Sequence, residues 1–178
     1  KHGAIGDMPT LDILERNDFN SLRNGRELAE LVASSVAFKA DIVSMDEREE
    51  GVRAILNFGH TVGHAMESFF AYRDISHGEA VAAGMVAEVM ISKRIGLLGD
   101  ADAERLLSLI RSYGLESRQW HLAADDVIGH MKYDKKNVGK DVRFVLLKGL
   151  CDPVFDRTVP ADLLHSVLTG FFRGSGES

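Results

Sequence analysis

Apolar residues recur at helical spacing along most of this chain, and that pattern limits the fold more than any other feature. After Arg26, for example, apolar side chains recur at Leu28, Leu31, Val32 and Val36, which is the spacing of an amphipathic helix. Glycine and polar residues interrupt further segments of the same kind, as they do at helix ends. The pattern predicts long helices over residues 26–43, 50–72, 77–95, 100–113 and 124–132.

The period changes only near the end of the chain. Residues 143–147 and 154–158 are short β-prone runs that flank a turn containing Gly149 and Pro153, so we expect a β-hairpin there. Pro160 suits the first turn of a closing helix. Near the start, residues 11–14 indicate one or two helical turns, and residues 17–25 a loop. The expected fold is a mostly helical bundle with one small hairpin.

Composition excludes several classes of protein. With 178 residues the chain has the length of one ordinary domain. Its net charge of -6 leaves no basic field for nucleic acid, and no apolar run reaches the length of a membrane span. The single cysteine, Cys151, excludes a disulfide framework and a thiolate metal cluster, and it favours a reducing cytoplasm.

A narrow polar stripe marks the segment from Glu50 to Phe70. On a continuous helix, Arg53, Asn57, His60, His64 and Glu67 would fall within an arc of about 80°, opposite an apolar face. The ordinary interpretation is a solvated helix face. Solvated faces favour lysine and glutamate, however, whereas this stripe offers residue types that bind anions, ligate metals and move protons. We therefore favour a functional stripe.

Histidines in and after this stripe could bind a metal. His60 and His64 are four residues apart, so both could reach one ion, although such a pair is common by chance. His77 strengthens the hypothesis, because a tight loop could return it beside His60. Imidazoles favour zinc or a similar transition metal. Glu67 or Glu79 could complete the shell, or could equally cap a helix or form a surface pair.

Two groups of lysines could bind an anion. Lys39 interrupts the inward stripe of its helix, where it could also be a snorkelling lysine. The loop Asp134-Lys135-Lys136-Asn137 could bind phosphate or carboxylate, or could simply be solvated. His2, His121, His130 and His165 have no partner in this pattern, so we assign them no role.

Taken together, these motifs resemble the signature of the 3-dehydroquinate synthase family. The resemblance is carried by NFGHTVGHAME at residues 57–67 and HGEAV at 77–81. It extends, in order along the chain, to KHGAI with Asp7 at the start, KADIV at 39–43, DE at 46–47, GVR at 51–53 and DKK at 134–136. It covers only the C-terminal helical domain of the family's two-domain fold. Residues 1–178 are then one metal- and substrate-binding domain.

The resemblance also implies a role for each matching residue. His60 and His77 would be two ligands of a catalytic zinc (or cobalt) ion, and the third would be a glutamate three residues before the position of Lys1. His64 and Asn57 would serve the phosphate end of the substrate and the chemistry there. The other implied substrate contacts are Lys39 and Arg53 for the carboxylate and hydroxyls, Lys1 near the metal-bound hydroxyls, Lys135 (rather than Lys136) for the phosphate, and Glu49 as a support for Arg53.

The implied activity converts 3-deoxy-arabino-heptulosonate 7-phosphate into 3-dehydroquinate and phosphate, in the shikimate pathway of aromatic amino acid biosynthesis. NAD would take a hydride and return it within each turnover, bound by an N-terminal domain of the same protein. A cytoplasmic homodimer is expected, and the 178 residues alone are expected to be inactive. Another sugar-phosphate cyclase, a metal-dependent polyol dehydrogenase and a non-catalytic helical module are the alternatives.

Overall fold

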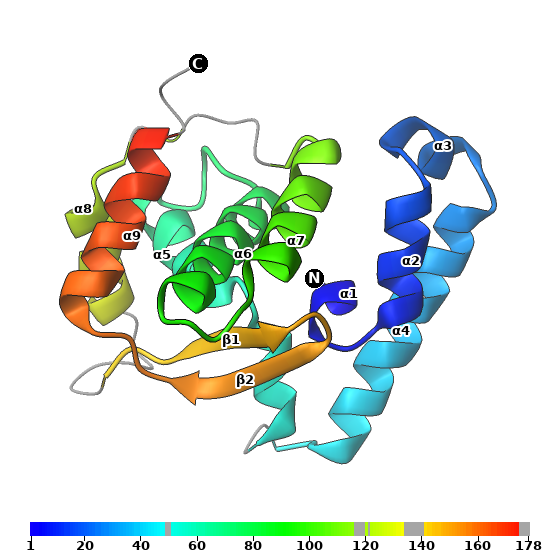
Figure 1. The fold of residues 1–178 in the computed structure, drawn as a ribbon, viewed down its shortest axis with the longest axis horizontal. Helices are drawn as coiled ribbons and strands as arrows, with labels where there is room; N and C mark the ends of the chain where they lie inside the picture. Colours follow the sequence, from blue (N-terminus) through cyan, green and yellow to red (C-terminus); the bar gives the residue numbers. More distant parts are fainter. Residues whose placement is uncertain (49–50, 116–119, 121, 134–140, 175–178) are drawn as a thin grey trace.

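A computed structural model describes residues 1–48, 51–115, 120, 122–133 and 141–174. It confirms the expected fold class, a mostly helical domain with one two-stranded antiparallel hairpin (Figure 1). The elements are α1 (His2–Ile5), α2 (Met8–Arg16), α3 (Phe19–Asn24), α4 (Glu27–Met45), the 3-10 helix η1 (Val52–Asn57), α5 (His60–Phe69), α6 (His77–Arg94), α7 (Asp100–Ser112), α8 (Ala124–Tyr133), β1 (Phe144–Gly149), β2 (Asp152–Arg157) and α9 (Ala161–Gly174).

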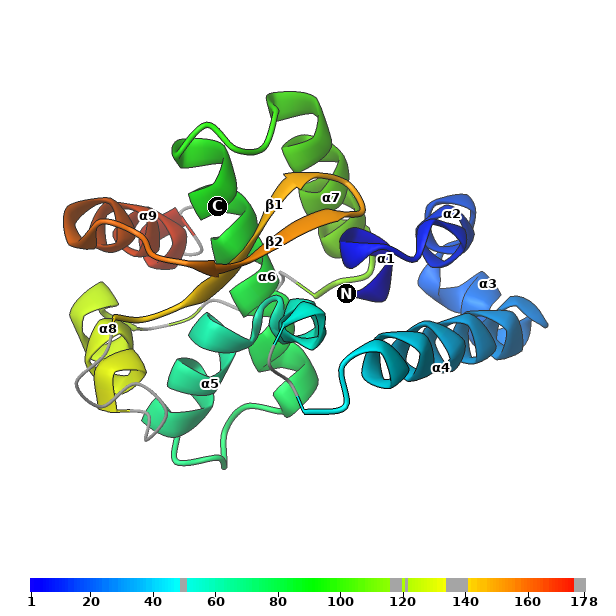
Figure 2. The same cartoon turned by 90° about the horizontal axis from the view of Figure 1, so that it is seen from below.

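Helix α6 is the centre of the core. It is buried on nearly all sides between Ala80 and Ser92, as expected for a helix that is apolar all round. Helices α5, α7 and α9 and strand β1 pack around it (Figure 2). Ser92 joins the helix to the hairpin, because its hydroxyl donates to the Glu88 carbonyl oxygen and accepts from the Leu147 N–H.

Helices α5 and α6 pack against each other at backbone distance. A Cβ added at Gly63 would lie 2.9 Å from the carbonyl oxygen of Ala80, and one added at Gly84 would lie 2.8 Å from the carbonyl carbon of Gly59. The start of α5 therefore faces the middle of α6, while Gly63, further along α5, faces Ala80, nearer the start of α6, so the two helices run antiparallel. Only glycine allows this approach, and it brings the start of α6 beside the second half of α5.

A second group of helices, α2 to α4, stands beside this core (Figure 1). Asp7 organises it as the N-cap of α2, accepting hydrogen bonds from the Thr10 N–H and the Ser34 hydroxyl of α4. The hairpin turn contacts α1 through the Cys151 N–H, which donates to the Ala4 carbonyl oxygen. These contacts place α1 between the hairpin and α4, so Lys1 and His2 lie at the junction of the two groups.

Two of the predicted segments were wrong in detail. Residues 19–24, expected in a loop, form α3, because Asp18 and Ser21 make a capping box at its start. The helix expected over residues 50–72 is broken: η1 ends at Asn57, Gly59 adopts a left-handed conformation with φ of 82°, and α5 begins at His60. The 80° arc across one continuous helix therefore does not exist.

No helix in the described part of the chain is both long enough and apolar enough to cross a membrane.

Candidate functional site

Three imidazole rings lie together at the junction of α5 and α6. The ring centroid of His60 is 5.2 Å from that of His64 and 5.4 Å from that of His77. Residues 71–76 return the chain so that His77, the first residue of α6, lies beside α5. The predicted return of His77 to His60 is confirmed, and its cause is the close glycine-mediated packing of the two helices.

Hydrogen bonds orient the two rings that we expected to bind metal. His60 Nδ1 lies 3.1 Å from the Phe58 carbonyl oxygen, and His77 Nδ1 lies 3.1 Å from Glu67 Oε1. Since a carbonyl or carboxylate oxygen accepts, each Nδ1 carries the proton, and each Nε2 keeps a lone pair for a ligand. A metal-binding histidine in proteins commonly has such an acceptor behind it.

The protonation state of His60 also suits a metal. Burial, together with the charge of the nearby Lys1, lowers the pKa of His60 to about 4. The ring is therefore neutral near pH 7, which is the form that coordinates a cation. A nitrogen donor set of this kind suits zinc or a similar transition metal better than magnesium or calcium.

The same cluster offers a second grouping of ligand atoms. One atom each from His64, Glu67 and His77 lie within 4.8 Å of one another. Glu67 is buried and already accepts the His77 Nδ1 proton, so in the arrangement observed it orients the His77 ring. Glu79, the other carboxylate considered from sequence, instead forms a capping box with Ser76 at the start of α6.

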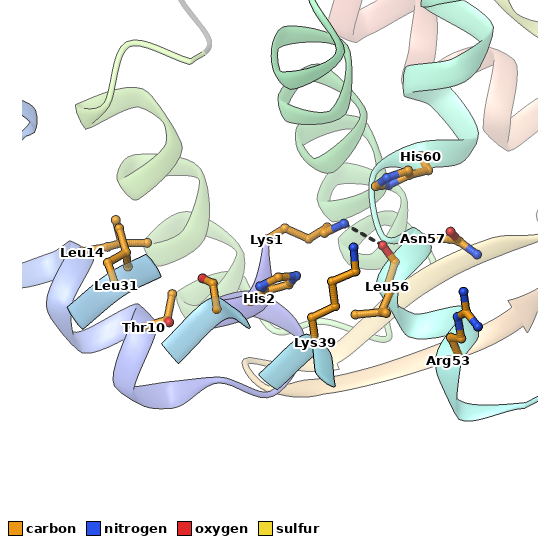
Figure 3. Close-up of a pocket in the computed structure, with 11 residues that line it drawn as sticks. Lys1, His2, Thr10, Leu14, Leu31, Lys39, Arg53, Leu56, Asn57 and His60 are labelled. Atoms are coloured by element: carbon orange, nitrogen blue, oxygen red, sulfur yellow. Dashed lines mark hydrogen bonds between the residues drawn. The ribbon is translucent and has the colours of Figure 1, made fainter. Parts of the chain in front are cut away.

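A cavity of about 560 Å³ opens beside His60 (Figure 3). It lies between η1 and the α1–α2–α4 group. Its lining residues are Lys1, His2, Thr10, Leu14, Leu31, Ser35, Lys39, Arg53, Leu56, Asn57 and His60.

Cationic side chains concentrate at the His60 end of this cavity. Lys1 Nζ donates to the Leu56 carbonyl oxygen at 2.8 Å, and Lys39 reaches toward the same place from α4 (Figure 3). Burial, together with the charge of Lys39, lowers the pKa of the Lys1 side chain. Arg53 enters from η1. This cluster of positive charge, with no carboxylate among the described residues that line the cavity, is suited to a polyanion.

Arg53 is held by the segment that precedes it. Its guanidinium donates to the Glu47 carbonyl oxygen at 2.9 Å, and its backbone N–H donates to the Asp46 carboxylate at 3.0 Å. Asp46 also accepts from the Gly51 N–H at 2.8 Å and so closes the turn before η1. The expected support from Glu49 lies outside the described residues.

The structure brings most of the predicted site residues together. Lys1, Lys39, Arg53, Asn57 and His60 line one cavity. The rings of His64 and His77 lie next to His60, at the edge of that group. Lys135 and Lys136 lie outside the described residues.

Sequence reasoning missed half of the cavity wall. His2, to which we assigned no role, lines the cavity, as do Thr10, Leu14, Leu31 and Ser35. These residues belong to α1, α2 and α4, and only tertiary packing brings them to η1. Their local patterns contain no signal that could have identified them.

Comparison with known proteins places these features in a family. Residues 1–137 match the family model for the 3-dehydroquinate synthase C-terminal domain. The chain is 43% identical to 3-dehydroquinate synthase of Azotobacter vinelandii over 97% of this chain and 48% of that protein. It is 40% identical to the Leptospira interrogans (serovar copenhageni) 3-dehydroquinate synthase over 88% of this chain and 43% of that protein. The chain thus spans about half the length of these relatives.

Solved structures share the fold at lower identity. 2-epi-5-epi-valiolone synthase from Streptomyces hygroscopicus, with NAD+ and Zn2+ bound, superposes with a TM-score of 0.80 and 22% identity over 97% of this chain and 49% of that one. 2-deoxy-scyllo-inosose synthase, complexed with carbaglucose-6-phosphate, NAD+ and Co2+, has a TM-score of 0.70 and 24% identity over 81% of this chain and 41% of that one. At these identities the likeness shows the fold.

Proposed function

Because this chain belongs to the 3-dehydroquinate synthase C-terminal domain family, we propose that it is the metal- and substrate-binding part of a 3-dehydroquinate synthase. The observation that carries the proposal is the meeting of a histidine cluster with a cationic cavity. His60 takes part in both, since its ring lies 5.4 Å from that of His77 and also lines the cavity with Lys39 and Arg53. A solvated helix face would need neither a histidine cluster nor a cationic cavity.

The proposed substrate fits the charge of the cavity. 3-Deoxy-arabino-heptulosonate 7-phosphate carries a carboxylate and a phosphate monoester, about three negative charges near neutral pH. Arg53 and Lys39 bind the carboxylate and adjacent hydroxyls, and the planar guanidinium supplies a two-pronged contact. Asn57 and His64 bind the phosphate end, and Lys1 lies near the hydroxyls that face the metal. Lys135 completes the phosphate contacts in this proposal.

The metal ligands from this chain are His60 and His77, each through Nε2. A bound zinc or cobalt ion would polarise a substrate hydroxyl as it becomes carbonyl-like. Glu67 holds the His77 ring by accepting its Nδ1 proton, and the Phe58 carbonyl oxygen does the same for His60. In this proposal a glutamate in the other half of the protein is the third ligand.

NAD belongs to the same proposal. The related cyclases named above were solved with NAD+ and Zn2+ or Co2+. We assign the nucleotide to an N-terminal domain of the complete protein, and we expect the complete protein to be a homodimer. Within this chain, the cationic groups would retain the phosphorylated substrate while the hydride is exchanged.

Other sugar-phosphate cyclases share the fold, but the sequence comparison favours dehydroquinate synthase. Relatives of that name are about 40% identical to this chain, whereas the valiolone and inosose synthases are 22% and 24% identical. We therefore retain a single candidate reaction.

The test is turnover by the complete protein. Purified enzyme with zinc and NAD is expected to release phosphate and form 3-dehydroquinate from the heptulosonate phosphate. His60→Ala and His77→Ala should lose bound metal and activity together. His165→Ala is the matched control, because His165 lies on α9 and pairs with Asp125. Wild-type protein that binds zinc and NAD but leaves the substrate unchanged would refute the proposed reaction.

A further inference from the structure

Helix α6 carries one carboxyl group in the middle of its apolar surroundings. Glu88 has no exposed surface. Its Oε2 accepts a hydrogen bond of 2.6 Å from the Gly59 N–H, while Oε1 makes no hydrogen bond of regular geometry with the described residues. Burial raises the pKa of Glu88 to about 8, opposed by the backbone N–H groups of Gly59, Thr61 and Val62. A buried carboxyl is costly, so its presence here calls for a specific role.

The start of α5 explains why a carboxyl from another helix is needed. The first N–H groups of a helix have no partner within it, and the N-cap side chain usually accepts from one of them. The N-cap of α5 is Gly59, which has no side chain. A side chain could not be added, because a Cβ there would lie 2.7 Å from the Val81 carbonyl oxygen and from Met85 Cγ. Glu88 supplies this acceptor: the N–H groups of Thr61 and Val62, in the first turn of α5, stabilise its carboxylate, and Oε2 also accepts from the N–H of Gly59 itself.

This contact lies beside the metal ligand. His60 is the residue immediately after Gly59 and the first residue of α5. Its Nδ1 is held by the Phe58 carbonyl oxygen, on the other side of Gly59. The peptide groups from Phe58 to His60 therefore determine the position of the His60 side chain and which ring nitrogen faces the metal site. Glu88 fixes these peptide groups by accepting the Gly59 N–H.

We propose that Glu88 is a positioning residue of the metal site: by capping α5 through Gly59, it places His60 Nε2 opposite His77. The inference deepens the proposed function and rests on it. Glu88 touches neither metal nor substrate, and it acts through the backbone. Groups that orient a metal ligand typically change metal affinity 10–100-fold when removed.

The experiment measures zinc affinity of the complete protein by competition with a chromophoric chelator, and the visible absorption of the cobalt-substituted form. Glu88→Gln keeps an acceptor for Gly59 and should bind zinc within about twofold of wild type. Glu88→Leu removes the acceptor and should weaken zinc binding by at least tenfold, with an altered cobalt spectrum. Glu88→Asp shortens the side chain by one methylene, and its zinc affinity should lie between those of Glu88→Gln and Glu88→Leu.

Val89→Ala is the matched control. It creates a cavity at the next residue, which is equally buried on α6, and it should lower stability while leaving the zinc affinity and cobalt spectrum of wild type.

The outcomes distinguish a positioning role of Glu88 from a purely structural role. If Glu88→Leu folds and binds zinc like wild type, or if it does not fold and Glu88→Asp binds zinc like wild type, then Glu88 is only a structural cap and the positioning role is refuted. If Val89→Ala weakens zinc binding as much as Glu88→Leu does, the effect is general destabilisation, and the positioning role is again refuted. If wild-type protein binds no zinc, the proposed metal site fails, and the positioning role fails with it.

Discussion

Replacing Gly84 by alanine tests whether the contact between α5 and α6 builds the histidine cluster. A Cβ at position 84 would lie 2.8 Å from the Gly59 carbonyl carbon and 2.9 Å from the Gly63 backbone nitrogen, and still closer to the Gly59 carbonyl oxygen. To restore ordinary contact at 3.4 Å, the two backbones must separate by at least about 0.6 Å. The three atoms nearest to the added Cβ all belong to backbone, which cannot swing aside as the end of a side chain can.

The expected cost follows from two opposing terms. Alanine in a helix interior gains about 1 kcal/mol over glycine. Overpacking costs about 1–3 kcal/mol, and the upper end applies where backbone meets backbone. The free energy of unfolding should therefore fall by about 2 kcal/mol. The same displacement would move His60 relative to His77. Metal–ligand distances in well-formed sites lie within about 0.2 Å of their standard values, so zinc affinity should fall as well.

The assay is urea unfolding of the complete protein, combined with zinc titration. Gly129→Ala is the control, since Gly129 lies in α8 and an added Cβ would meet no described atom within 4 Å apart from the neighbouring backbone of its own helix. That variant should gain roughly 0.5–1 kcal/mol and keep its zinc affinity. If Gly84→Ala is stabilised as Gly129→Ala is, and binds zinc unchanged, then α5 and α6 do not pack as closely as described.

Three further outcomes are expected of the complete protein. Arg53→Lys should keep its metal but lose about 2 kcal/mol in kcat/KM, roughly thirtyfold, because an ammonium cannot copy a bidentate contact. The measurement is steady-state kinetics at matched zinc content, and an unchanged kcat/KM would show that Arg53 does not contact the substrate. His64→Ala should retain zinc that His60→Ala and His77→Ala lose, as measured by atomic absorption. Loss of zinc in His64→Ala and His77→Ala, with zinc retained in His60→Ala, would instead favour the His64–Glu67–His77 grouping, and equal loss in all three variants would refute the separate role of His64. Burial raises the pKa of Glu88 from 4.5 to about 8, so its contribution to stability is fully present below pH 4.5 and is lost as pH rises to about 8, by at most about 1.4 kcal/mol per unit. Urea unfolding at pH 5 and pH 8 should therefore show Glu88→Gln gaining on wild type with rising pH, and a pH-independent difference would contradict the raised pKa.

Local sequence was sufficient for most of the secondary structure. Helices α4, α6, α7 and α8 and the hairpin were predicted close to their observed bounds, because their side-chain periodicity and end signals act within a few residues. The motif residues of the site were found in the same way, since His60, His64 and His77 occur at recognisable spacing and match a family signature.

Tertiary contacts decided the rest. Whether residues 50–72 form one helix or two depends on Gly59, whose left-handed conformation allows the chain to pass at backbone distance from Gly84. The spacing of apolar residues along the sequence contains no information about Gly84 as a neighbour of Gly59. The role of Glu88 depends on the same contact, although a charged residue inside the apolar run of α6 was a visible clue. Thr10 and Ser35 reach the cavity only because α4 packs against η1 and α2 packs against α4. Periodicity determines which face of each helix is buried, whereas the steric fit between distant helices determines which polar groups meet.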